Sequence, residues 1–195
     1  MFRYRRVMSS SATRIARDEA VSASAAAVVD LLNSRAYAGK ADRLDTPESA
    51  TEVLRPFGQE DGGPSPHRLD LVRAIRSDLL DVLAAADPSD TAGNWAAFSG
   101  RVSSITFQQD FSEPGQVLLR QITGDPVAGR ITRDVAALVA AGGWSRLKLC
   151  ANHECRAVFY DTTRSRTRRW HSYEYCGNRT NVAAYRARTA GCGGD

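Results

Sequence analysis

The sequence predicts an α+β fold: a mainly helical N-terminal domain with one β-hairpin, followed by a small module of a second β-hairpin and a helix. Apolar residues recur at three- and four-residue spacing before residue 145, a period of two appears near residue 107, and every cysteine follows residue 149. The 195 residues, 43% of them hydrophobic, suffice for one ordinary domain and a small appendage. The expected divisions are a loose basic N-terminal tail over residues 1–17, the helical domain over 18–144, the small module over 145–190 and a disordered tail over 191–195.

Helical signals follow one another along the first 144 residues. Helix starts combine a capping residue with proline in the first turn, as in Asp45-Thr46-Pro47-Glu48, and glycine pairs mark helix ends. Five helices are expected. The first begins near Asp18, the second and third cover about 47–54 and 69–83, the fourth lies around Trp95 to Ile105, and the fifth runs from Asp125-Pro126 to Gly142-Gly143.

A β-hairpin interrupts these helices. Apolar residues alternate from Ile105 to Phe111, and a second β-like run extends from Val117 to Ile122. Glu113-Pro114-Gly115 between them is typical of a turn. The aromatic residues of this part of the chain are expected to lie in the core: Trp95, Phe98, Phe107 and Phe111.

No arrangement typical of an enzyme is found in the helical domain. It contains no phosphate-binding glycine loop, no Ser/His/Asp set and no paired-histidine motif, so we expect a non-enzymatic protein. No apolar stretch is long enough to cross a bilayer, and the basic start lacks the apolar segment of a signal peptide. We therefore expect a cytoplasmic protein that does not contact membranes and whose thiols stay reduced.

Two ligand pairs in the C-terminal third predict a metal site. Cys150 and Cys155 are separated by four residues and flanked by short β-like runs, so a tight turn can direct both thiolates at one ion. His171 and Cys176 have the same separation. Three thiolates and one imidazole complete a tetrahedral structural zinc site without an open position. The sequence therefore predicts one structural Zn²⁺.

Alternatives to this ligand set remain open. The cysteines can instead form disulfides or stay as buried thiols, and His153 or Cys192 can replace His171 as the fourth ligand. His153 is expected to face outward from the turn between the first two cysteines, and Cys192 lies in a glycine-rich terminal segment expected to fray.

A module of this size needs the metal to fold. About 40 residues bury too little apolar surface for stability on their own. A small core is expected from Phe159, Trp170, Tyr175, Val182 and Tyr185. We therefore expect chelation to unfold the module and to leave much of the helical domain intact.

Positive charge concentrates in the same third of the chain. From Arg146 to Arg188 there are ten basic and three acidic residues, whereas the whole chain carries a formal net charge of only +4. Arginine binds phosphate through two parallel hydrogen bonds, so this charge favours nucleic acid as a partner. The expected contacts are Arg164, Arg166, Arg168, Arg169, Arg179, Arg186 and Arg188, the last three on or beside a helix from Asn178 to about Thr189.

Some of these residues have alternative structural roles. Arg179 can instead pair with Asp161 inside the module, and Trp170 fits a core position better than a base-stacking platform. Gly177 and Asn178 follow a ligand directly, where turn geometry and helix capping favour both residue types.

These motifs resemble the bacterial CGNR zinc-finger proteins. The resemblance rests on Leu149-Cys150…Cys155, Phe159-Tyr160-Asp161, Arg168-Arg169-Trp170 and Cys176-Gly177-Asn178-Arg179…Tyr185-Arg186-Ala187-Arg188. Upstream, Asp30-Leu31-Leu32-Asn33-Ser34-Arg35 and Leu44-Asp45-Thr46-Pro47-Glu48 resemble an ABATE-type N-terminal domain. The resemblance implies a stress-linked transcription regulator. The family commonly has cysteine after its Arg-Arg-Trp motif, where this chain has His171, and histidine is also an acceptable zinc ligand.

The leading hypothesis is a transcription regulator whose zinc module binds DNA. Its N-terminal domain would sense a small-molecule effector or form a homodimer. The alternatives are a zinc-containing protein-interaction adaptor and an RNA-binding protein, both non-enzymatic. A redox enzyme acting through Cys155 or Cys176 is disfavoured, because a closed four-ligand site suppresses thiol reactivity.

Overall fold

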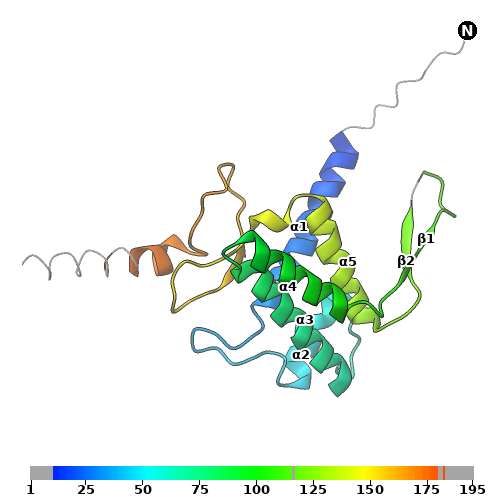
Figure 1. Cartoon of the computed structure of the whole chain (residues 1–195), viewed down its shortest axis with the longest axis horizontal. Helices are drawn as coiled ribbons and strands as arrows, with labels where there is room; N and C mark the ends of the chain where they lie inside the picture. The colour runs from blue at the N-terminus through cyan, green and yellow to red at the C-terminus, as the bar shows by residue number, and fades with distance from the viewer. Residues whose placement is uncertain (1–10, 116, 180–181, 183–195) are drawn as a thin grey trace, which may run out of the picture.

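The computed structural model describes residues 11–115, 117–179 and 182, and the side chains of this set from residue 22 onward. Helices form the body of the molecule, with one hairpin on either side of it (Figure 1). The elements in chain order are α1 (Ser11–Leu32), α2 (Pro47–Leu54), η1 (Arg55–Phe57), α3 (Pro66–Ala84), α4 (Pro88–Arg101), β1 (Phe107–Asp110), β2 (Leu118–Gln121), α5 (Pro126–Ala140), η2 (Trp144–Arg146), β3 (Leu147–Leu149), β4 (Val158–Tyr160) and η3 (Tyr173–Gly177).

Four helices begin in the same way. The residue before each has an extended backbone, its side chain accepts a hydrogen bond from a backbone N–H of the first turn, and proline follows it. Proline lacks the N–H that a helix start leaves unpaired, so the pair both caps and directs the helix. The capping residues of α2, α3, α4 and α5 are Thr46, Ser65, Asp87 and Asp125.

The first helix is longer than expected. It begins at Ser11, seven residues before the expected start near Asp18, so the predicted loose tail over residues 1–17 is wrong from Ser11 onward. Alanine and arginine make up four of the seven residues from Ser11 to Arg17, and both have a high helix propensity. Residues 1–10 lie outside the described residues, as does the predicted tail over 191–195.

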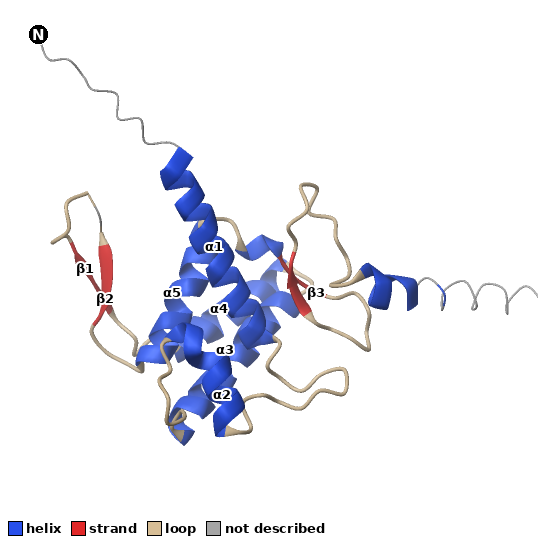
Figure 2. Cartoon of the chain, turned by 180° about the vertical axis from the view of Figure 1, so that it is seen from behind, coloured by secondary structure: helices blue, strands red, loops and turns tan. Residues whose placement is uncertain are grey.

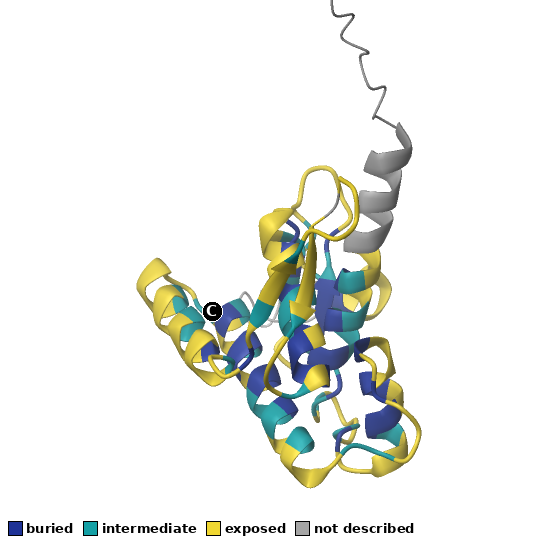
Figure 3. Ribbon diagram, turned by 90° about the vertical axis from the view of Figure 1, so that its right-hand side faces the viewer, coloured by how far each residue is buried: buried dark blue, intermediate teal, exposed yellow. Residues whose placement is uncertain are grey.

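The core is buried between the helices. Helix α1 packs against α5, and α3 packs against α4, so that the apolar faces of the helices meet inside the body (Figure 3). The largest fully buried side chains of the core are Phe57, Leu31, Leu32, Leu44, Leu54, Ile75, Leu79, Ile131 and Leu138. The helices expected over about 47–54, over 69–83 and from Asp125-Pro126 onward are confirmed. The helix expected around Trp95 to Ile105 is present with other bounds, because it begins at Pro88 and ends at Arg101.

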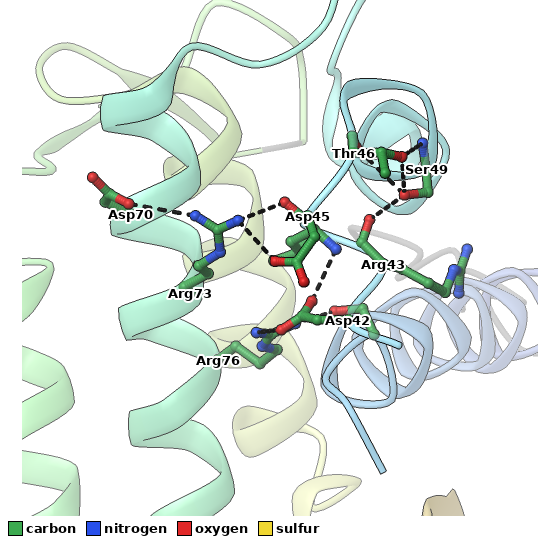
Figure 4. A network of polar contacts seen from close by, with 10 residues as sticks. Asp42, Arg43, Asp45, Thr46, Ser49, Asp70, Arg73 and Arg76 are labelled. Atoms are coloured by element: carbon green, nitrogen blue, oxygen red, sulfur yellow. Dashed lines mark hydrogen bonds and ion pairs between the residues drawn. The ribbon is translucent and has the colours of Figure 1, made fainter. Parts of the chain in front are cut away.

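Ion pairs fix the loop between α1 and α2 to helix α3. The guanidinium of Arg76, only 8% exposed, donates to both carboxylate oxygens of Asp42 at 2.8 and 2.5 Å and to Ser34 Oγ at 2.7 Å (Figure 4). Burial is the largest influence on the pKa of Asp42 and would raise it. The hydrogen bonds from Arg76 and from the N–H of Leu44, together with the charges of Arg76 and Arg73, outweigh burial and leave the pKa lowered. Arg73, one helical turn before Arg76 on α3, donates to the backbone oxygen of Leu44 in the same loop. The loop is thereby held in one position.

The β1–β2 hairpin projects from the body on the side opposite to η3 (Figures 1 and 2). Phe107 pairs with Gln121 at its base, where both residues pack against α5. Beyond the base the strands leave the body, and Phe111 is 67% exposed, so its predicted place in the core is wrong. Phe98 is buried as expected, and Trp95 and Phe107 pack against the core.

The β3–β4 hairpin shares the core of the helical body. Leu147 and Val158, one on each strand, are buried among the same residues as the helices. The side-chain amide of Asn33 at the end of α1 donates to the backbone oxygen of Val158 at 2.8 Å, and its oxygen accepts from the N–H of Val158 at 2.8 Å. Asn33 therefore pairs with the outer edge of β4 as a further strand would. These features confirm the α+β fold class.

None of the described helices has the length and apolar character needed to cross a membrane.

Candidate metal centre

A tight turn after β3 presents the first two cysteines. The N–H of Cys150 donates to the backbone oxygen of Ala157 at 2.7 Å, which continues the hairpin ladder one step beyond β3. The N–H groups of Cys155 and Arg156 both donate to the backbone oxygen of Asn152 at 3.0 Å. The chain then reverses through Arg156, whose φ of 52° is a left-handed conformation that glycine adopts at lower cost. Cys150 and Cys155 consequently lie on one side of the turn.

A buried ion pair shapes the segment that carries the other two ligands. Asp161, at the end of β4, is fully buried and accepts from Lys148 Nζ at 2.7 Å and from the hydroxyl and N–H of Thr163. The hydrogen bond from Lys148, followed by those from Thr163, holds the pKa of Asp161 well below its usual range. Lys148 is thus the cationic partner of Asp161. The suggested pairing of Asp161 with Arg179 is wrong, because Arg179 lies 3.4 Å from the exposed carboxylate of Glu154.

Arg168 braces the approach to His171. Its backbone N–H donates to Asp161, and its guanidinium donates to the backbone oxygens of Trp170 and His171 while lying over the ring of Phe159. The backbone oxygen of Arg169 accepts from the N–H of Ala151 at 2.9 Å, which ties this segment to the cysteine turn. Arg168 therefore helps to position a ligand.

The fourth ligand lies in η3, a single wide helical turn. Ser172 caps it, because its side chain accepts from the N–H of Tyr175 and its backbone oxygen accepts from the N–H groups of Cys176 and Gly177. A Cβ at Gly177 would lie 2.8 Å from the ring of Tyr173, so a larger residue would require this exposed ring to shift. The structure thus gives Gly177 a steric role beside Tyr173, and Gly177 is not among the described glycines with a positive φ. The predicted helix from Asn178 starts earlier, and its part over 180–181 and 183–189 lies outside the described residues.

The ligand atoms of Cys150, Cys155, His171 and Cys176 all lie within 4.8 Å of one another. The Nδ1 atom of His171 is 3.3 Å from the sulfur of Cys155 and 3.5 Å from that of Cys176. A tetrahedral zinc ion, with bonds of about 2.3 Å to sulfur and about 2.0 Å to nitrogen, requires a sulfur–nitrogen separation of about 3.5 Å. The four side chains therefore fit one tetrahedral ion, as predicted.

Among the described residues, the structure supports neither the alternative fourth ligand nor a disulfide between Cys150 and Cys155. His153 is exposed in the turn and does not belong to the cluster, whereas Cys192 lies outside the described residues. Cys150 and Cys155 are free thiols.

The surroundings of the site shift the pKa values of two of its ligands, His171 and Cys176. Burial, with Arg168 and Lys40 nearby, lowers the pKa of His171, so its imidazole is neutral and can offer a lone pair. Burial and hydrogen bonds with Cys155 and Cys150 raise the pKa of Cys176 to about 11. A Zn²⁺ ion bound here would supply the positive charge that stabilises the thiolate of Cys176.

The helical body contributes to the wall of the site. Cys150 and Cys176 are 1% and 4% exposed, and Tyr37 from the loop after α1 packs against them together with Trp170. Arg35 and Lys40 both lie over the Tyr37 ring, 5.1 and 5.4 Å from its centroid. The metal site thus lies at the junction of the body and the C-terminal segment.

The predicted small core is only partly present. Phe159 is buried and Trp170 packs against the thiols, but Tyr175 is 72% exposed and Val182 is also exposed. The prediction for these two residues is wrong, because the hairpin uses the core of the body and does not need to build its own. Tyr185 lies outside the described residues.

Comparison with known families agrees with this geometry. Residues 146–189 match the CGNR zinc finger. This CGNR zinc finger contains all four clustered side chains, so the predicted cofactor, one structural Zn²⁺, is confirmed. The match covers less than a quarter of the chain, and the resemblance of the N-terminal region to an ABATE-type domain stays a prediction. A comparison with curated proteins found no match.

The predicted nucleic-acid contacts fall into three groups. Arg164, Arg166 and Arg169 are exposed on the loop before His171, and none of them forms an ion pair with another described residue. Arg168 is turned inward, and Arg179 is exposed beside Glu154. Arg186 and Arg188 lie outside the described residues.

Sequence reasoning missed two important residues. Arg156 is exposed beside the site. Two features of the sequence could have indicated this: it is one of the basic residues between Arg146 and Arg188, and it directly follows the ligand Cys155. Asn33 shows no such signal, because a polar residue at the end of an amphipathic helix gives no hint of a strand edge 125 residues away.

Proposed function

We propose that the CGNR zinc finger binds DNA and that the chain is a transcription regulator. The observation that carries the proposal is the row of exposed arginines on the loop between the two ligand pairs. Arg164, Arg166 and Arg169 are free of acidic partners among the described residues, so their guanidinium groups are available for phosphate. The role is one of binding and not of catalysis, because three thiolates and an imidazole leave zinc no open position.

Zinc has a structural part in this proposal. It holds His171 and Cys176 against the cysteine turn, and the arginine loop spans the chain between Asp161 and His171. With both ends of the loop fixed, the arginines are presented at a defined surface, and less conformational entropy is lost on binding.

The helical body has a place in the same proposal. Asn33 and Arg35 at the end of α1 bond the backbone of Val158 and Arg156 in the finger. A small-molecule effector or a homodimer contact on the body can therefore change the position of the finger through α1, which is how a regulator would couple a signal to DNA.

The proposal is tested with purified, zinc-loaded full-length chain and fluorescent random-sequence DNA. Binding is measured by anisotropy over a range of salt, with duplex and single-stranded forms of the same DNA. Each phosphate contact releases counterions, so log affinity should fall linearly with log salt concentration. Replacing Arg164 and Arg166 together by alanine should weaken binding and reduce the salt slope by about 2.

The matched control removes the same charge elsewhere. Arg55 and Arg130 are exposed arginines of the helical body, and their joint replacement by alanine should leave the affinity nearly unchanged. Absence of binding to either DNA form at low salt contradicts the proposal and favours the protein-interaction adaptor. Tighter binding to RNA of the same sequence than to DNA contradicts the choice of DNA.

A further inference from the structure

A shallow groove lies where the zinc finger meets the end of α3. Its floor is apolar and comes from both parts of the molecule, with Leu83 and Ala84 from α3 and Leu147 and Leu149 from β3. Its volume is about 600 Å³, the size of a small-molecule site. The groove therefore joins the body and the finger in one concave surface.

The rim of this groove is strongly basic. Five of the residues that line it are cationic, and none is acidic. Lys148 and Arg168 are engaged with Asp161 and with backbone oxygens. The exposed cations that remain are Arg156, Arg166 and Arg169, which form no ion pair within the described part of the chain.

Two of these arginines have an unfavourable backbone. Arg156 and Arg166 have φ angles of 52° and 53°, in the left-handed region that glycine occupies most readily. Elsewhere in the described residues, Ala38 is the one other residue besides glycine with a positive φ. Backbone strain of this kind concentrates at functional sites, where the side chain is needed for a reason other than folding. Neither side chain forms an ion pair that would offset the strain.

We propose that this groove binds an unpaired segment of single-stranded DNA. The proposal rests on the proposed function and narrows it to one form of DNA. An apolar floor suits the faces of bases and the sugars, and a rim of guanidinium groups suits the phosphates on either side. A duplex hides the faces of its bases in the stack and is read by convex elements that enter its grooves. A concave surface with an apolar floor is therefore better matched to an open strand.

The contribution of α3 separates this proposal from DNA binding by the finger alone. Ala84 is exposed on α3 and far in sequence from the zinc ligands, yet it lines the groove. A negative charge at this position would repel phosphate without disturbing the metal. Replacement of Ala84 by glutamate therefore tests the groove, and replacement by glutamine is the control of equal size.

The experiment uses the zinc-loaded full chain with a labelled oligo-dT of about 12 nucleotides, a length within the usual range of single-strand sites, and a duplex of equal length. The single strand should bind at least about tenfold tighter than the duplex, and Ala84→Glu should weaken that binding about tenfold while Ala84→Gln leaves it nearly unchanged. Arg156→Gly should also weaken it, with a melting temperature no lower than that of the unmodified chain, because glycine relieves the left-handed strain.

The outcomes separate the two proposals. Binding of neither DNA form contradicts the proposed function itself. Equal or tighter binding of the duplex overturns the groove proposal and leaves DNA binding intact. Single-strand binding that ignores both Ala84→Glu and Arg156→Gly also overturns the groove proposal, because the strand would then lie elsewhere on the finger.

Discussion

The two ligand pairs of the metal site are held in different ways. Cys150 and Cys155 lie in the turn of the β3–β4 hairpin, whose inner side chains, Leu147 and Val158, are buried in the core of the helical body. His171 and Cys176 belong to a segment in which Tyr173 and Tyr175 are exposed. One half of the site is therefore positioned by the fold, and the other half depends on the ion and on a few polar contacts.

This difference corrects the view of the finger as a separate small domain. A module that folds only around its metal would lose its whole structure on chelation. Here the β3–β4 hairpin shares a continuous core with the helices and is bonded to Asn33 at its edge. The metal dependence should be confined to the segment after Asp161.

The largest expected effect is that of losing the metal. Chelation, or Cys150→Ser, removes an interaction that contributes about 10 kcal/mol or more in isolated zinc fingers. We expect new protease cleavage within residues 162–179, no zinc by elemental analysis, and nearly unchanged helical circular dichroism. His153→Ala is the matched control, because this exposed histidine lies in the same turn outside the cluster and its loss should leave zinc bound. Loss of the helical signal on chelation would show that the body also depends on the ion.

The next effect concerns the body, which holds its own loop without a metal. Asp42→Asn leaves the buried guanidinium of Arg76 without its counter-charge and should cost about 3 kcal/mol of unfolding free energy, measured by denaturant titration, with zinc retained. Asp61→Asn is the control: it affects an exposed pair with Arg55 and should cost about 0–1 kcal/mol. Release of zinc from Asp42→Asn would show that the two regions are more tightly coupled than their contacts indicate.

The stability that the Asp42–Arg76 pair contributes depends on pH in a defined direction. The pKa of Asp42 is lower in the folded chain, so its contribution is complete above the unfolded value of about 3.9 and is lost as the pH falls through the folded pKa. The stability difference between the unmodified chain and Asp42→Asn should therefore shrink below about pH 4. A difference that stays constant down to pH 2, measured in the metal-free chain, would contradict an ionic role for Asp42.

The smallest expected effect tests the junction itself. Asn33→Ala leaves the backbone N–H and oxygen of Val158 without their partner and should cost about 1–3 kcal/mol. Asn33→Asp keeps the acceptor for the N–H and places a carboxylate against the oxygen, so it should not restore the stability of the unmodified chain. If amide hydrogen exchange at Val158 is the same in Asn33→Ala as in the unmodified chain, Asn33 is not what protects this strand edge.

Local sequence determined much of this protein. The capping residue and proline at the starts of α2 and α5, the turn at Glu113-Pro114-Gly115 and the matched spacing of the two ligand pairs each act over a few residues. These two helix starts, the β1–β2 hairpin and the four zinc ligands could therefore be predicted. The choice of His171 over His153 was also predicted, since the first belongs to a segment that must fold back onto the turn.

Tertiary structure alone decided how these parts meet. The pairing of Asn33 with Val158, the inward turn of Arg168, the exposure of Phe111 and the placing of Ala84 beside the arginine loop all depend on residues far apart in the chain. Periodicity and motif spacing report which face of an element is apolar or which residues can share an ion. They do not report which neighbour covers that face, because burial is a property of the packed body and not of any one segment.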